Sequence, residues 1–263
     1  RDMLGSAGFA KPPTYWGELP NLVAKVAKKD DTGRLVKAAI SFGEYQNVDH
    51  AKDIMSLLIF QAGGNITERD NTGNLVPSLS ARTAGSQQAA ESALRFYTEF
   101  ADPSKAHYSW SRAMPSSREA FIAGDLALYF GYASEAGELA RANPNLNFAA
   151  APVPQSNTVK EAETLRQSDI SGKRTDVARV YALAISRASK NPGGALIAAL
   201  LIGEKGVARG LSVALGLPSA HRDVLAESGQ DENVLFESQA IIARSWIDPD
   251  TEKTDAVFRA MIE

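Results

Sequence analysis

The sequence contains no cysteine among its 263 residues. This absence excludes disulfide bonds, thiol catalysis and zinc sites built from thiolates, and it leaves the redox compartment undetermined. Long hydrophobic runs are missing too, because the densest stretch, GALIAALLIG, is far shorter than the roughly 18 residues that a membrane span needs. The first residues, RDMLGSAGFAKPP, hold neither a signal-peptide core nor an initiator methionine, so we interpret the sequence as a mature, trimmed or truncated form.

The sequence also lacks a surplus of basic residues. Lys and Arg number 28 against 31 Asp and Glu, which gives a formal net charge of -3. This balance does not indicate a partner such as nucleic acid or an anionic membrane surface. Hydrophobic residues make up 44% of the chain, an ordinary share for a globular protein. The length fits one large domain or two lobes.

The sequence motifs of common enzyme classes are missing as well. There is no GxSxG, no HExxH and no GxxxxGK[ST] phosphate loop. His50, His107 and His221 are far apart and have no metal-ligand spacing, so we interpret them as solvated or loop residues and expect no metal site. Asp30 and Asp31 lie in a charged turn, which favours solvated surface over acid-base work. These observations predict a protein that is not an enzyme and needs no cofactor.

Apolar periodicity predicts helices and strands that alternate along the chain, which is typical of the α/β class. The segment SREAFIAGDLALYFGY, residues 117–132, predicts a helix, a Gly-Asp turn and a strand that ends on Gly131 and Tyr132. Residues 65–82 are expected to be irregular, and 155–175 to form a loop or crossover. Other helices are expected at 16–26, 47–62, 86–102, 134–142 and 192–215, the last broken near Gly203, and after Pro218 around the loop SWIDPDTEK; other strands are expected at 35–42, 146–154 and 177–189.

Aromatic and polar residues gather where the predicted elements end. Open α/β sheets bind ligands at the carboxyl ends of their strands. Aromatic rings stacked on sugar rings, with amides and carboxylates bonded to the hydroxyls, would make such a crevice selective for carbohydrate. The candidates are Tyr45 and Asn47 after one strand, Tyr108 and Trp110 before a helix, Tyr129 and Tyr132 at a second strand, Tyr181 in a third, Trp246 in a late loop, and the loop carboxylates Glu44 and Asp248.

Core packing competes with a ligand role for each aromatic residue. Trp16 lies on the apolar face of a predicted helix, so we interpret it as core. Core packing is also favoured for Tyr129 and Tyr181, because both lie inside apolar strands. The two interpretations stay open for the residues in loops or at element ends, which are Trp110, Tyr132 and Trp246.

Four segments carry a resemblance to a known family. In chain order, PPTYWGELPNLVAKVAKK, SREAFIAGDLALYFGY, LNFAAAPVPQ and ALAISRASKNPGGALIAALLIGEKG resemble motifs of the extracellular solute-binding proteins of ABC importers, in the maltose-binding-like group. The resemblance covers nearly the whole chain, although each motif is degenerate and the ordered set carries it. Tyr15 separates Thr14 from Trp16, which displaces the usual helix cap, and Asp125 and Leu128 replace a common lysine and methionine.

The resemblance implies an α/β fold with periplasmic-binding-protein-like (type II) lobes. About a hundred residues that build most of the first lobe in the family are missing from this sequence, and a lipobox cysteine would be lost with them. The expected division is residues 1–155 as the second lobe, 156–218 as a crossover and return segment of the first lobe, and 219–263 as helices that pack back on the second lobe.

The resemblance also implies a function. A monomeric protein of this kind would capture a small solute, a sugar or oligosaccharide, between two hinged lobes and deliver it to a membrane permease driven by a separate ATPase. It would be extracellular or periplasmic and tethered through a segment absent from this chain. Gly131 would let the backbone approach the ligand, and Tyr132 would present its ring and hydroxyl. The expected ligand contacts are Tyr45, Asn47, Trp110, Tyr132, Trp246, Tyr108, Glu44 and Asp248.

Two alternatives remain open from the sequence. The same lobes could serve as a cell-surface sensory or adhesion module that binds a protein partner. A glycosidase would need two carboxylates beside a cleft, for which Glu44 and Asp248 are the candidates.

Overall fold

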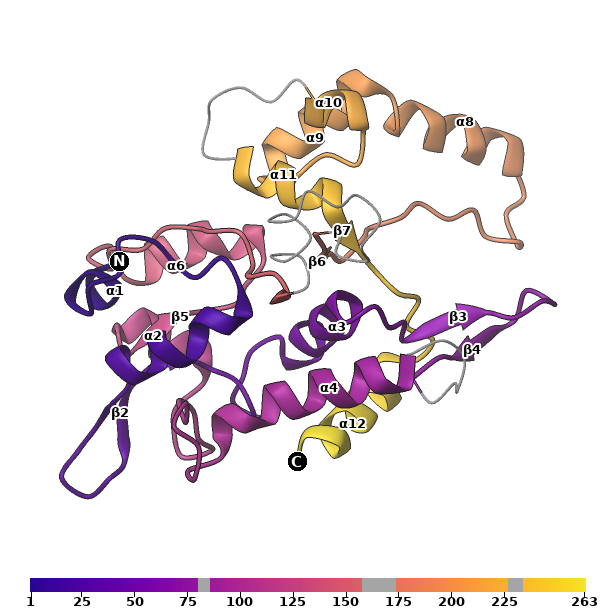
Figure 1. Cartoon of the computed structure of the whole chain (residues 1–263). Coiled ribbons are helices and arrows are strands. Elements are labelled where there is room, and N and C mark those ends of the chain that lie inside the picture. Colours follow the sequence, from indigo (N-terminus) through magenta and orange to yellow (C-terminus); the bar gives the residue numbers. More distant parts are fainter. Residues whose placement is uncertain (80–85, 158–173, 227–233) are drawn as a thin grey trace.

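A three-stranded sheet forms the centre of the main body. The computed structural model describes residues 1–79, 86–157, 174–226 and 234–263 (Figure 1). In the sheet, β2 (Leu35–Ile40) lies between β1 (Lys28–Lys29) and β5 (Leu126–Leu128), antiparallel to the first and parallel to the second. Both apolar strands were predicted from the sequence, and their parallel register pairs Ala38 with Leu126 and Ile40 with Leu128.

One buried side chain caps two amides near the end of β2. The hydroxyl of Ser109 accepts hydrogen bonds from the backbone N–H groups of Ala39 and Ile40, each at 3.0 Å. Ser109 is itself fully buried. Because buried N–H groups without a partner are costly, this single oxygen stabilises the strand just before its carboxyl end.

The helices of the main body cover the sheet with apolar faces. Trp16 is buried among Phe42, Phe96 and Phe130, so its predicted core role is confirmed. The helix α3 is buried along most of its length, and both α4 and α12 pack against it. The elements are η1 (Trp16–Glu18), α2 (Leu19–Val26), α3 (Ala51–Gln61), α4 (Ser86–Thr98), η2 (Glu99–Ala101) and α12 (Thr251–Ile262).

The predicted helix and turn of residues 117–132 are confirmed, but the strand that was expected to end on Gly131 and Tyr132 ends at Leu128. The helix α5 (Ser117–Ala123) begins with a capping box, in which Ser116 accepts from the N–H of Glu119 and the Glu119 side chain accepts from the N–H of Ser116. It ends at Gly124, which has φ = 80°, a conformation that glycine adopts without strain. The chain then enters β5 directly.

The expectation of an irregular chain at residues 65–82 was wrong in part. Strands β3 (Thr67–Arg69) and β4 (Leu75–Pro77) form an antiparallel hairpin. Its turn is organised by Asp70, whose carboxylate accepts from the backbone N–H groups of Thr72 and Asn74. Residues 80–82 lie outside the described ranges. Shorter elements are α1 (Asp2–Ser6), η3 (Ala133–Glu135) and α6 (Ala136–Ala142).

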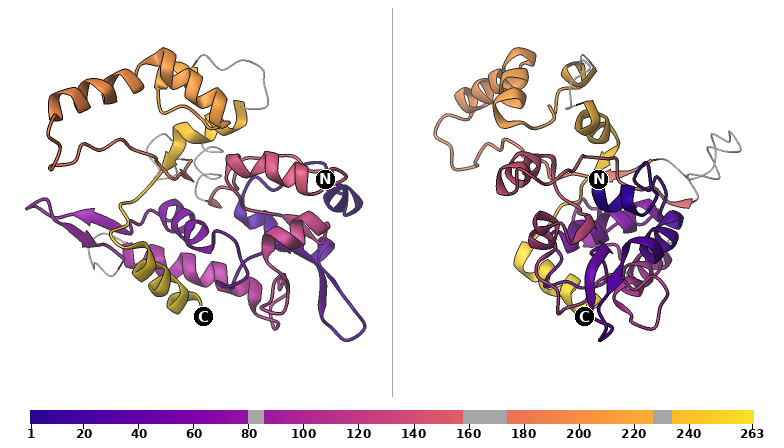
Figure 2. Two further views of the ribbon diagram at one scale, coloured as in Figure 1. Left: turned by 180° about the vertical axis from the view of Figure 1, so that it is seen from behind. Right: turned by 90° about the vertical axis from the view of Figure 1, so that its left-hand side faces the viewer.

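A second group of helices stands apart from the main body (Figures 1 and 2). Its helices pack in sequence, α8 on α9, α9 on α10 and α10 on α11, and α11 contacts β6. The break near Gly203 was predicted. None of the helices in the described ranges has both the length and the apolar character to cross a membrane. The elements are β6 (Asp176–Val177), α8 (Pro192–Ile202), α9 (Lys205–Leu215), α10 (Arg222–Ala226), α11 (Val234–Ile242) and β7 (Ala243–Arg244), with β6 parallel to β7.

Two predicted strands are not formed as expected. At 177–189 only Val177 belongs to a strand, and Tyr181 is 88% exposed, so core packing of this ring was the wrong interpretation. At 146–154 the chain is irregular, and the nearest pairing is one bridge between Tyr15 and Gln155. The physical reason is that a strand needs a neighbour for its backbone hydrogen bonds, which an apolar sequence cannot supply by itself.

We expect Ser109→Ala to lower the free energy of unfolding by about 1–3 kcal/mol, because two buried amides lose their acceptor. Urea denaturation followed by circular dichroism measures the change. Ser104→Ala is the control, since that hydroxyl bonds only to Asp102 in an exposed turn and should matter little. Equal stability of the two variants would contradict the role of Ser109.

Candidate functional site

The carboxyl ends of β2 and β5 define one place where loops converge. The two strands are parallel, so the chain leaves both at the same edge of the sheet. The loop after β2 leads to α3 at His50, and the loop after β5 leads to η3 at Tyr132. This edge is where an open α/β sheet offers a ligand site.

His50 adopts an unusual backbone conformation at this edge. It is the N-cap of α3 and has φ = 60°, the only positive φ of a non-glycine residue in the described parts of the chain. Such a conformation is sparsely populated and persists only when the surrounding contacts hold it. The His50 side chain is only 19% exposed, so of the two predicted alternatives, solvated or loop residue, His50 is a loop residue whose ring is largely buried.

The imidazole of His50 binds a carboxylate from the loop after β5. Nε2 of His50 lies 2.7 Å from Oε1 of Glu135. The other carboxylate oxygen of Glu135 accepts from the Tyr129 hydroxyl at 3.1 Å and from the Tyr132 backbone N–H at 3.2 Å. Burial would raise the pKa of Glu135, but the bonds from His50 and Tyr129 hold it below its ordinary value, so Glu135 is ionised.

Arg179 joins this cluster from the segment that follows β6. Its guanidinium lies 2.8 Å from Oδ2 of Asp53 and 5.0 Å from the centre of the Tyr132 ring. Asp53 also lies 4.0 Å from Nδ1 of His50. We call this group the His50 cluster; its members are His50, Asp53, Tyr129, Tyr132, Glu135 and Arg179.

The Tyr132 hydroxyl is the unsatisfied group of the His50 cluster. Its oxygen is buried beside Asp53 and Arg179 but has no hydrogen-bond partner of good geometry. Burial, and then the negative charge of Asp53, raise the pKa of this phenol, so it stays protonated and can both donate and accept. A buried polar atom without a partner calls for an explanation, and a bound hydroxyl group would supply the partner.

Gly131 is required by the packing of the same cluster. A Cβ atom at this position would collide with the Glu135 carboxylate and would lie 2.6 Å from the Tyr129 ring. Glycine is therefore required three residues after the end of β5, because two members of the His50 cluster pack against the backbone there. The close approach to a ligand that the resemblance implied for Gly131 stays a prediction.

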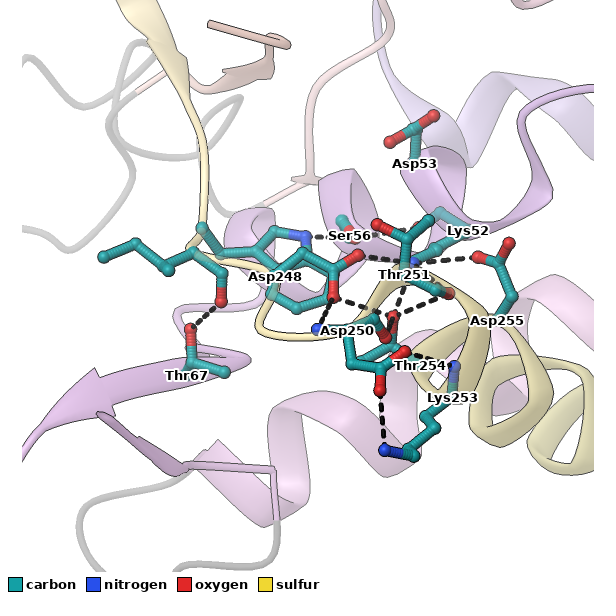
Figure 3. Close-up of polar contacts among 12 residues, drawn as sticks. Lys52, Asp53, Ser56, Thr67, Asp248, Asp250, Thr251, Lys253, Thr254 and Asp255 are labelled. Carbon is teal, nitrogen blue, oxygen red and sulfur yellow. Dashed lines mark hydrogen bonds and ion pairs between the residues drawn. The ribbon is translucent and has the colours of Figure 1, made fainter. Parts of the chain in front are cut away.

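A second cluster joins α3 to the C-terminal helix (Figure 3). The ammonium group of Lys52 lies 2.7 Å from Asp248, 2.8 Å from Asp255 and 2.6 Å from the Thr254 hydroxyl. It also lies 5.4 Å from the centre of the Trp246 ring. We call these residues, Lys52, Trp246, Asp248, Thr254 and Asp255, the Lys52 cluster.

Trp246 and Asp248, both predicted as ligand contacts, hold α12 in this cluster. The Trp246 ring stacks on Phe258 of α12, and its N–H donates to the Ser56 hydroxyl at 3.2 Å. Burial would raise the pKa of Asp248, but Lys52 and Thr254 hold it below its ordinary value. An ionised carboxylate paired with lysine does not suit a general acid, which argues against the glycosidase alternative.

Asn47 and Trp110 are hydrogen-bonded to each other inside the main body. Trp110 is fully buried, and its indole N–H donates to Oδ1 of Asn47 at 3.1 Å. The Asn47 amide donates to the carbonyl groups of Ser111 and Met114. Trp110 is thus enclosed in the main body and the half-buried Asn47 amide is bonded to the chain, and the ligand roles of both stay predictions.

The remaining predicted contacts lie in separate places. Glu44 pairs with Arg112 at 3.0 Å. Tyr45 lies beside Arg259 and Asp255 of α12, and burial followed by the Asp255 charge raises its pKa to about 12. Tyr108 lies under the ammonium group of Lys29. The predicted set is therefore not gathered in one cleft of this chain, and its ligand roles stay predictions.

The sequence reasoning missed most of the His50 cluster. Asp53 and Glu135 lie on helical segments whose charges resemble those of a solvated surface, and Arg179 lies in a predicted strand more than a hundred residues away. The available signal was the position of His50 and Glu135 just after the ends of two predicted strands. Two surface hollows lie along α4, and no residue of the His50 cluster lines either of them.

The fold is that of the type II periplasmic-binding proteins, which confirms the resemblance at the level of fold. One similar structure is a cyclo/maltodextrin-binding protein complexed with maltotetraose, with a TM-score of 0.67 and 14% identity over 97% of this chain and 60% of that chain. Another is an ABC transporter solute-binding protein from Thermotoga lettingae bound with tagatose, with a TM-score of 0.61 and 18% identity over 99% of this chain and 62% of that chain.

A third similar structure is the maltose/maltodextrin-binding domain MalE from Bdellovibrio bacteriovorus bound to maltotriose, with a TM-score of 0.59 and 14% identity over 97% of this chain and 61% of that chain. The chain thus spans less than two thirds of the length of these similar proteins. No family model matches the chain, and no curated protein matches it.

We expect Lys52→Met to lower the free energy of unfolding by about 1–3 kcal/mol, because it leaves two partly buried carboxylates without their cation. The folded-state pKa of Asp248 lies below its ordinary value of 3.8, so the stability gained from the pair is present above that pH. The stability is lost as the pH falls through the lower folded value. The difference between wild type and variant should therefore be full near neutrality and should narrow below about pH 4.

Lys253→Met is the matched control for this experiment. Lys253 also pairs with an aspartate of the same region, Asp250, but its side chain is 84% exposed. Chemical denaturation across pH 3–8 compares the three proteins. Equal losses in Lys52→Met and Lys253→Met, or a Lys52→Met loss that persists at acid pH, would contradict the assignment.

Proposed function

We propose that this chain is the larger part of an extracellular solute-binding protein that captures a sugar or oligosaccharide between two hinged lobes. The captured solute would pass to a membrane permease of an ABC import system, with energy from a separate ATPase. The protein would act as a monomer outside the cytoplasm, tethered to the membrane, and would not be an enzyme. Residues 1–155 would form the second lobe, 156–218 the crossover and return segment of the first, and 219–263 the helices that pack back.

The fold supports the coarse part of this proposal. The matches extend over 96–99% of this chain, and the printed names of the matched proteins describe binding of maltodextrins, mannobiose, tagatose and maltotriose. These names describe binding proteins. At this low sequence identity the comparison supports a shared architecture only. The choice of solute depends on the residues of this chain.

The unsatisfied Tyr132 hydroxyl carries the proposal at the level of residues. It lies at the carboxyl edge of the parallel strands, where an α/β lobe meets its ligand. Around it stand two carboxyl groups, an imidazole and a guanidinium, which together can donate to and accept from sugar hydroxyls. The phenol ring could also stack on a sugar face if Arg179 moved aside.

Closure of the lobes follows from this placement. The His50 cluster combines residues of the main body with Arg179, which belongs to the return segment. A ligand bound at Tyr132 would contact both lobes only in the closed state, so binding would shift the population toward that state.

The test uses the entire product of the gene that encodes this chain, because the chain alone holds part of a cleft. Maltotriose, mannobiose and tagatose are titrated in a thermal-shift screen and then by calorimetry. A ligand that binds only the folded state must raise the melting temperature, so we expect a shift with at least one sugar. No shift with any carbohydrate of a wider panel would overturn the proposal and favour the protein-binding alternative.

We expect Tyr132→Phe to weaken the sugar that binds by about 5–30-fold, because it removes one hydrogen bond of about 1–2 kcal/mol while keeping the ring. Tyr108→Phe is the matched control, because that phenol lies by Lys29 and not in the His50 cluster. Calorimetric titration gives both dissociation constants. An unchanged affinity in Tyr132→Phe would remove Tyr132 from the ligand site.

A further inference from the structure

The guanidinium group of Arg179 occupies a place with the chemistry of a cation-binding site. It lies 5.0 Å from the centre of the Tyr132 ring and 2.8 Å from Oδ2 of Asp53. An aromatic face beside a carboxylate attracts a cation through the ring quadrupole and the negative charge together. One cation, supplied by the chain itself, is therefore already bound here. We call the place between Asp53 and the Tyr132 ring the cation position.

The two sides of the cation position are held in place more closely than its occupant. The Asp53 side chain is only 16% exposed, and the Tyr132 ring packs edge-on against His50, with 4.9 Å between the ring centres. The Arg179 side chain, in contrast, is 62% exposed. Because water solvates an exposed guanidinium well, its release costs little as long as Asp53 receives another cation.

Charge decides which solute can take the place of Arg179. Within the described ranges, Arg179 is the only lysine or arginine paired with Asp53. A neutral sugar that displaced Arg179 would leave a largely buried carboxylate without its cation, and an acidic sugar would add repulsion. An ammonium group on the solute would restore the pair.

The buried hydroxyl of Tyr132 sets a second requirement. Its oxygen lies beside Asp53 and Arg179, yet the guanidinium leaves it without a hydrogen-bond partner. The five donors of a guanidinium form a fixed planar fork, whereas an ammonium group is compact and its donors rotate. In a 2-amino sugar the amine also stands beside a carbon that carries a hydroxyl group. One molecule can therefore supply a cation to Asp53 and a hydroxyl to Tyr132.

We propose that the solute is an amino sugar whose ammonium group replaces the Arg179 guanidinium between Asp53 and the Tyr132 ring. Arg179 fills the cation position in the free protein and leaves it when the solute binds. The inference rests on the proposed function, because it names the class of sugar captured at the same edge of the sheet. The rival occupant is a polyamine, which shares the ammonium chemistry but brings no hydroxyl to Tyr132.

Three chemical forms of the same sugars separate these occupants. Calorimetry on the entire gene product compares mono- and disaccharides of glucose, galactose and mannose, each as the parent sugar, the 2-amino sugar and the N-acetyl form, with spermidine as the sugar-free cation. The titrations are run at about pH 6, where the amine is protonated. We expect one amino sugar to bind about 30-fold or more tightly than its parent and N-acetyl forms, because only the amine pairs with Asp53.

Two variants test the two partners in the ion pair at the cation position. Asp53→Asn should weaken the amino sugar about 10-fold or more and change the parent sugar less than about 2-fold, because it removes the charge and keeps the shape. Arg179→Ala should tighten the amino sugar by about 3–10-fold, because the solute no longer competes with the guanidinium. The melting temperature of each free variant shows that it is folded.

Arg112→Ala is the matched control for Arg179→Ala. Arg112 also pairs with a carboxylate, Glu44 at 3.0 Å, and its side chain is 55% exposed. It lies outside the His50 cluster, so its removal should leave the affinity for the amino sugar unchanged.

The outcomes separate this inference from the proposed function. Parent or N-acetyl sugars that bind as tightly as the amino sugars would overturn the inference and leave sugar capture standing. Weaker binding of the preferred sugar in Arg179→Ala would also overturn it, because Arg179 would then be a ligand contact. Binding of spermidine with no sugar in any form, or no binding at all, would overturn the proposed function together with the inference.

Discussion

The first turn of α3 holds three distant segments of the chain together through charged side chains. His50 binds Glu135 after β5, Lys52 binds Asp248 and Asp255 near α12, and Asp53 binds Arg179 after β6. The three side chains of α3 are at most 19% exposed, which makes the loss of a partner costly for them, whereas Asp255 and Arg179 are 48% and 62% exposed. The edge of the sheet and the C-terminal helix both depend on these pairs for their position.

The same turn of α3 places the proposed ligand site beside a set of ion pairs that hold the fold together. The Lys52 cluster is fully paired and fixes α12 against α3. In the His50 cluster one phenol oxygen has no partner, at the edge where Arg179 arrives from the segment that follows β6. The Lys52 cluster therefore fixes the helix that carries His50 and Asp53, which would hold the proposed ligand site in place.

The sequence predicted those elements whose stabilising contacts lie within a few residues of one another. The capping box of Ser116, the left-handed turn at Gly124 and the buried run of β5 all lie within a few residues of one another, and the sequence predicted their order. The strand at 177–189 was predicted from the same kind of pattern, yet the described chain offers most of it no neighbouring strand. At the site, the sequence predicted a role for Tyr132. It could not predict the ion pair of Arg179 with Asp53, because the two residues are 126 positions apart and no local sequence pattern links them.

The most direct measurement of the central claim is a crystal structure of the entire gene product with its bound sugar. Our interpretation predicts a sugar hydroxyl within hydrogen-bond distance of the Tyr132 phenol oxygen, at the carboxyl ends of β2 and β5, with the first lobe closed over it. A sugar bound elsewhere, with the Tyr132 hydroxyl still buried and without a partner, would contradict it.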